Sequence, residues 1–149
     1  MGVLFNYYTA ADDRAAAGAI VRDDDEPFGT GYDEFTVKGI DPMVGLLPAE
    51  SLLTGRPEAQ LAADPGRNRL VAMLEDGEIV ALTIPDALRD ALTAADHHTL
   101  TAAGLAWSRS DTFDMLPDEA HLTEFLEQLA ALARRAASRG HHLYCWICP

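Results

Sequence analysis

The chain has 149 residues, of which 48% are apolar and 23% are charged, so it can bury one core without disulfides or a metal. Its 24 acidic and 11 basic side chains give a net charge of −13, which disfavours binding to nucleic acids and to anionic membranes. No apolar run reaches the length of a membrane helix, and the start lacks the pattern of a signal peptide. We therefore expect one cytoplasmic domain over 1–149.

The first part of the chain predicts a strand followed by a helix. Residues 3–8 are rich in β-prone side chains, which favour a strand. Thr9 and Asp12 have the spacing of a capping box, so we expect a helix from there to about Val21. The acidic run 23–26 and the Pro- and Gly-rich residues up to Tyr32 predict a loop.

The next segments predict short elements. Residues 35–37 favour a short strand, and Asp41-Pro42 opens a helical region. A helix over 48–54 is expected because Pro48 stands at its start and Gly55 follows its end. A further short helix is expected over 57–63.

A hairpin is the strongest local prediction. Two β-prone runs, 70–74 and 79–82, flank Asp76-Gly77, a dipeptide that tolerates the positive φ angles of a tight turn. Thr83 and Asp86 have capping-box spacing, which predicts the start of another helix.

The last third of the chain predicts a long helix and a closing strand. Residues 97–110 are ambiguous and favour a turn with a short helix ending near Trp107. From Pro117 the apolar side chains follow the periodicity of a buried helical stripe, and Gly140 is expected to end that helix. Residues 141–149 have the composition of a strand. Together these elements predict an α+β fold with a small, mainly antiparallel sheet, built from the terminal strands and the hairpin and packed against several helices.

The order of these pieces resembles the YfbM-like family of small bacterial proteins of unknown function. The segments that carry the resemblance are the apolar start after Met1-Gly2, Gly39-Ile40-Asp41, Ser51 to Gly55, Leu82 to Asp86, Trp107, and Arg134 to Gly140 before the closing strand. The lysine that follows the aspartate in the family is Pro42 here. The resemblance implies an α+β fold and brings no known activity, substrate or catalytic residues.

Three groups of residues have the side-chain types of a metal or redox site but lack its arrangement. Cys145 and Cys148 have C-x-x-C spacing, but residues three apart on a strand point to opposite faces, so we expect a structural role. Paired histidines at 97–98 and 141–142 lack the helical spacing of a zinc site. The acidic run 23–26 lacks the ligand pattern of a calcium loop, and a solvated loop is favoured. We therefore predict neither a metal nor a cofactor.

The candidate binding residues are mainly aromatic. If the first and last strands pair, the aromatic residues Tyr7, Tyr8, Tyr144 and Trp146 could line one face of the sheet together with His142. A pocket wall and a core under the long helix both fit this pattern. Asp41 and Trp107 are added because they lie in the segments that resemble the YfbM-like family.

Two hypotheses of function stay open. The first is a non-catalytic module that binds or inhibits a basic protein partner, in the manner of an immunity protein, because an acidic surface steers basic partners. The second is a small enzyme or small-molecule-binding protein with an aromatic pocket, for example in specialised metabolism. No sequence motif of a known catalytic site is present, which favours the first.

Overall fold

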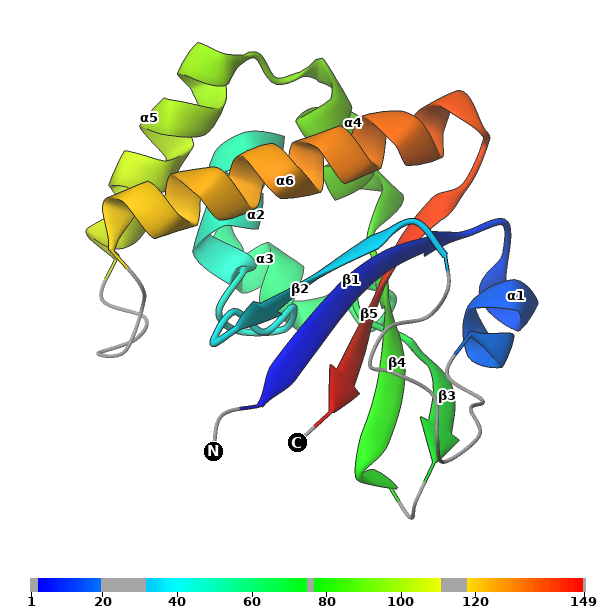
Figure 1. The fold of residues 1–149 in the computed structure, drawn as a ribbon. Coiled ribbons are helices and arrows are strands. Elements are labelled where there is room, and N and C mark those ends of the chain that lie inside the picture. Colours follow the sequence, from blue (N-terminus) through cyan, green and yellow to red (C-terminus); the bar gives the residue numbers. More distant parts are fainter. Residues whose placement is uncertain (1–2, 20–31, 75–76, 111–117, 149) are drawn as a thin grey trace.

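Five strands form one antiparallel sheet, with helices on both faces (Figure 1). The computed structural model describes residues 3–19, 32–74, 77–110 and 118–148. The strand order is β2-β1-β5-β4-β3. The strands are β1 (Leu4–Ala10), β2 (Glu34–Lys38), β3 (Leu70–Leu74), β4 (Ile79–Ile84) and β5 (His142–Cys148). The predicted α+β class is confirmed.

The closing strand β5 occupies the centre of the sheet. It pairs with β1 on one side and with β4 on the other, both antiparallel. The predicted hairpin forms, because β3 pairs antiparallel with β4; Gly77 has a φ of 97°, whereas Asp76 lies outside the described residues. Each sheet face is therefore a row of alternate residues from β1, β5 and β4.

The long helix α6 (Glu119–Ser138) covers one face of the sheet. The stripe predicted from the sequence is its buried side, and Asp118 caps it by accepting a hydrogen bond from the His121 N–H at 2.9 Å. Helices α4 (Asp86–Ala94) and α5 (His97–Ser108) pack against α6. Helix α2 (Leu47–Thr54) packs on α4, α5 and α3 (Glu58–Ala63), and both of the predicted short helices are found.

The opposite face is covered by the short helix α1 (Asp13–Gly18). Tyr8, Tyr144 and Trp146 are buried there with the alanines of α1. The aromatic side chains of β5 therefore pack on the face away from α6, rather than under the long helix.

The two predicted capping boxes are wrong, and for the same reason. Thr9 lies in β1, where its N–H donates to the carbonyl of Asp33 at 3.1 Å, and Asp12 caps α1 instead. Thr83 lies in β4, and its hydroxyl accepts the backbone N–H of Arg69 at 2.8 Å. Both threonines are strand residues with hydrogen-bond partners outside the helices, so neither caps the helix that follows.

Helix α5 is longer than the sequence predicts. Asp96 caps it by accepting from the Thr99 N–H at 2.7 Å, and it runs for 12 residues to Ser108. The first helix ends at Gly18, with Ala19 as its C-cap, so it is shorter than the predicted helix to about Val21. Residues 23–31 of the predicted loop, and Pro117 at the predicted start of the last helix, lie outside the described residues. In the described ranges, no helix combines the length and the apolar character that a bilayer crossing needs.

Candidate functional sites

Asp41 organises the turn between Ile40 and Leu46. Its carboxylate accepts the backbone N–H groups of Met43, Val44 and Gly45 at 3.0, 2.7 and 3.0 Å. Three donors on one carboxylate fix the turn, because a charged acceptor makes stronger hydrogen bonds than a neutral one. The position of Asp41 thus has a clear architectural role.

The side chains of Tyr7 and Trp107 donate hydrogen bonds to backbone carbonyls of the same turn. The Tyr7 hydroxyl donates to the carbonyl of Ile40 at 2.8 Å, and the Trp107 indole N–H donates to the carbonyl of Gly45 at 3.0 Å. Both side chains are fully buried, and burial raises the pKa of the Tyr7 hydroxyl well above its ordinary value. Three of the six candidate residues therefore meet at one turn, which the sequence pattern did not anticipate.

Arg67 closes this network with a buried ion pair. Its Nε lies 2.7 Å from a carboxylate oxygen of Glu50, and its other nitrogens donate to the carbonyls of Met43 and Pro42 at 2.7 and 3.1 Å. The exposed fractions are 6% for Arg67 and 1% for Glu50, so both charges are shielded from water. Neither residue carries a local sequence signal, since 17 positions separate them.

The turn presents two apolar side chains to solvent. Met43 and Val44 are 46% and 47% exposed, although the backbone beneath them is fixed by Asp41 and Arg67. Beside them lies a hollow of about 310 Å³, lined mainly by Met43, Val44, Leu47, Leu61, Ala62, Asp64 and Pro65. We call these seven residues the Met43–Val44 surface. Two adjacent exposed apolar side chains beside a hollow, on a turn held by several hydrogen bonds, are a candidate contact for a partner.

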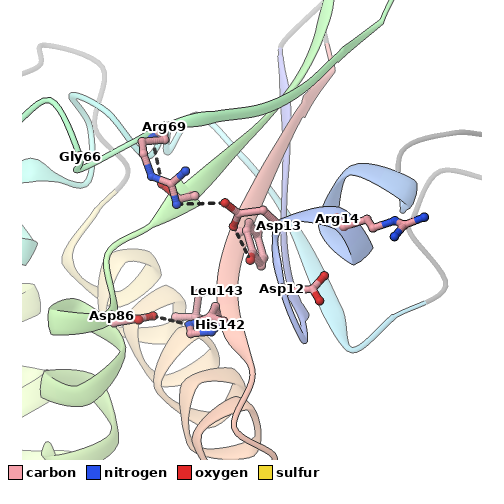
Figure 2. A pocket seen from close by; sticks show the side chains of 10 residues that line it. Asp12, Asp13, Arg14, Gly66, Arg69, Asp86, His142 and Leu143 are labelled. Atoms are coloured by element: carbon pink, nitrogen blue, oxygen red, sulfur yellow. Dashed lines mark hydrogen bonds and ion pairs between the residues drawn. The ribbon is translucent and has the colours of Figure 1, made fainter.

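A second, more polar cavity lies on the face of the sheet that carries α1 (Figure 2). Its volume is about 540 Å³, within the range of small-molecule sites. His142 of β5 lies on its wall, and its Nδ1 is 2.8 Å from the carboxylate of Asp86, the first residue of α4. The two side chains are 40% and 51% exposed.

Asp13, the first residue of α1, links this helix to two other residues that line the cavity. It accepts a hydrogen bond from the Tyr144 hydroxyl at 2.9 Å and one from Arg69 at 3.0 Å. These donors favour the charged carboxylate, so they lower the pKa of Asp13, led by the bond from Tyr144. Burial and the neighbouring Asp13 raise the pKa of Tyr144, which keeps its proton.

The predicted aromatic face is wrong for Tyr7. Tyr7 pairs with Cys145 in β5, whereas Tyr8 pairs with Tyr144, and directly paired residues share a face. Tyr7 accordingly packs edge-on against Phe125 of α6, with ring centres 5.2 Å apart. Of the other candidates, His142 and Tyr144 line the polar cavity, and Trp146 is buried beside them without lining it.

Cys145 is buried in the core, where burial raises the pKa of its thiol well above the ordinary value. The side chain of Cys148 lies outside the described residues. Among the described His, Cys, Asp and Glu side chains, no three gather as a metal site. The residues that sequence reasoning missed are Glu50, Arg67, Asp13 and Asp86, all of which act on partners distant in the chain.

Comparison with known protein families, with curated proteins and with solved structures finds no match to this chain.

Proposed function

We propose that this protein is a non-catalytic binding module that recognises a basic protein partner through the Met43–Val44 surface, in the manner of an immunity-type inhibitor. The observation that carries the proposal is the exposure of Met43 and Val44 on a turn that Asp41, Tyr7, Trp107 and Arg67 hold rigid. A preorganised apolar anchor loses little conformational entropy on binding. Methionine is also enriched at the centres of protein interfaces.

The charge of the chain defines the chemistry of the partner. A net charge of −13 accelerates encounters with a basic protein and opposes binding to nucleic acid or to an anionic membrane. The proposed partner therefore carries a basic rim around an apolar contact, and the proposed location is the cytoplasm. The resemblance to the YfbM-like family belongs to the same proposal and adds no partner to it.

The test compares a double variant of the Met43–Val44 surface with a single control variant. The double variant Met43→Ser with Val44→Ser removes the apolar anchor, and Leu52→Ser removes a 50% exposed side chain of α2 that lies outside the Met43–Val44 surface. Each immobilised protein is incubated with lysate of the source cells at 50 mM and at 500 mM NaCl. We expect a basic protein that the native chain and Leu52→Ser retain at low salt, and that the double variant loses.

The affinity of the retained protein for each variant is the second test of the proposal. The retained protein is purified and titrated calorimetrically against each variant. We expect the dissociation constant to rise at least tenfold for the double variant, about 1.4 kcal/mol, and to stay unchanged for Leu52→Ser. Equal affinity of all three proteins, or a retained protein that is acidic, contradicts the proposal.

The second candidate is a small-molecule or enzymatic role. The observation that favours it is the cavity of about 540 Å³ beside His142. The aromatic form of that hypothesis has little support, because Tyr8, Tyr144 and Trp146 are at most 3% exposed and so offer no open ring face. The cavity therefore supports a small-molecule site with a polar lining rather than an aromatic one.

A further inference from the structure

His142 and Asp86 form a positioned pair at the wall of the polar cavity. The carboxylate oxygen of Asp86, 2.8 Å from Nδ1, favours the tautomer with the hydrogen on Nδ1, and an N–H of Arg89 lies farther from the same nitrogen, at 3.4 Å. In that tautomer the lone pair is on Nε2, for which the described residues provide no hydrogen-bond partner. An imidazole with one nitrogen held by a carboxylate and the other one open is the arrangement of a general base.

The surroundings fix this pair in place. From α4, the Arg89 guanidinium lies 3.5 Å from Asp86 and donates to the backbone carbonyl of His141 at 2.8 Å, so it ties the helix start to β5. The other charged groups lining the cavity come from α1, namely Asp12, Asp13 and Arg14, and from Arg69 before β3. Figure 2 shows the Arg14 side chain pointing away from the cavity, whereas Arg69 extends across it toward Asp13.

We propose that His142, positioned by Asp86, is the general base of an esterase site that takes small, uncharged carboxylic esters into this cavity. Nε2 accepts a proton from a water molecule while the water oxygen forms a bond to the acyl carbon. When the resulting tetrahedral adduct collapses, the bond to the alkoxy oxygen breaks, and the proton on Nε2 passes to that oxygen. The products are the acid and the alcohol, and the imidazole is regenerated.

Arg69, a cation in the lining of the same cavity, is the residue to which the proposal assigns stabilisation of the negative charge in this step. Its side chain is 54% exposed at the cavity, and one terminal nitrogen holds Asp13 at 3.0 Å. The remaining N–H groups of the guanidinium can donate to the oxygen that becomes negative in the adduct. The inference develops the second candidate, an enzymatic role, and its confirmation would replace the non-catalytic part of the first. The Met43–Val44 surface and this cavity share no residue, so the binding function and the esterase site are tested separately.

The probe is p-nitrophenyl acetate, with the release of p-nitrophenol as the readout. We expect His142→Gln to lower kcat/KM by about 100-fold, which is a usual contribution of a general base. His98→Gln is the matched control, because His98 is exposed on α5 and outside the cavity, and its rate should equal that of the native protein. Equal rates for the native protein and His142→Gln overturn the proposal.

Asp86 is tested as a positioning residue on the intact fold. Asp86→Asn should lower kcat/KM about tenfold and move the pH profile of kcat, while KM and the melting temperature stay near the native values. Nitrogen-15 NMR of the native protein should show the His142 hydrogen on Nδ1. A hydrogen on Nε2 in that spectrum overturns the proposal without recourse to any variant.

Discussion

Arg67 is the side chain on which the Met43–Val44 surface depends. It joins the carbonyls of Pro42 and Met43 to Glu50 of α2, so one guanidinium connects the turn to a helix. Glu50 is 1% exposed, and one of its carboxylate oxygens has no hydrogen-bond partner. Its charge is therefore compensated mainly by Arg67, and removal of that partner leaves a buried charge unpaired.

Arg67→Ala should lower the free energy of unfolding by about 3–5 kcal/mol, because it leaves the carboxylate of Glu50 uncompensated. Arg69→Ala is the matched control, since its ion pair with Asp13 is about half exposed, and it should cost less than about 1 kcal/mol. Urea unfolding of both variants at pH 7 provides the measurement. Similar losses for the two variants contradict the assigned role of Arg67.

The sequence predicts single residues well only where the relevant contact is local. Alternation along β5 correctly separates Tyr144 and Trp146 from Cys145, because it follows from strand geometry alone. The face of Tyr7 depends on how β1 is registered against β5, and neighbouring Tyr7 and Tyr8 give no signal of that register. The Asp86–His142 pair spans 56 positions and becomes visible only when the strands are assembled.

At the level of elements, helices α5 and α6 are in close contact at Gly104. A Cβ atom there would overlap Thr123 Oγ1 and lie 3.1 Å from Thr123 Cα. The hydroxyl can turn away, but the backbone of α6 cannot move without disturbing the core behind it. The absence of a side chain at Gly104 thus sets the spacing of the two helices.

Gly104→Ala should destabilise the protein by about 1–3 kcal/mol through overpacking, although alanine is the better helix former by about 1 kcal/mol. Gly18→Ala in α1 is the control, because nothing lies within 4 Å of a Cβ at that position. Its effect should be neutral or stabilising by up to about 1 kcal/mol. Thermal unfolding distinguishes them, and a stabilised Gly104→Ala variant would show that the helices can separate at no cost.

Elements with a repeating local pattern are those that the sequence predicts. The apolar stripe of α6 is confirmed because its periodicity extends over many residues, and the hairpin of β3 and β4 is confirmed because two β-prone runs flank a turn dipeptide. The capping boxes at Thr9 and Thr83 fail because two residues with the right spacing are a weak signal beside a strand that continues through them. Helix α5 is predicted too short because its buried side is interrupted by small and polar residues.

For the whole molecule, the net charge of −13 opposes the compact state through self-repulsion. Salt screens this repulsion, so the melting temperature should rise by several degrees between 20 mM and 500 mM NaCl at pH 7. Calorimetry provides the measurement, and sodium sulfate at equal ionic strength separates screening from specific effects of the anion. A melting temperature that falls with NaCl would mean that attractive ion pairs dominate.

The central place of β5 also has a consequence for folding. In the described sheet, the pair β1–β2 and the pair β3–β4 are joined through β5, which follows all four strands in the chain. During synthesis at the ribosome, the edges of β1 and β4 that pair with β5 therefore stay open until β5 has emerged. Open edges invite pairing with other chains, so a nascent chain of this protein is a natural client for chaperones that shield such edges.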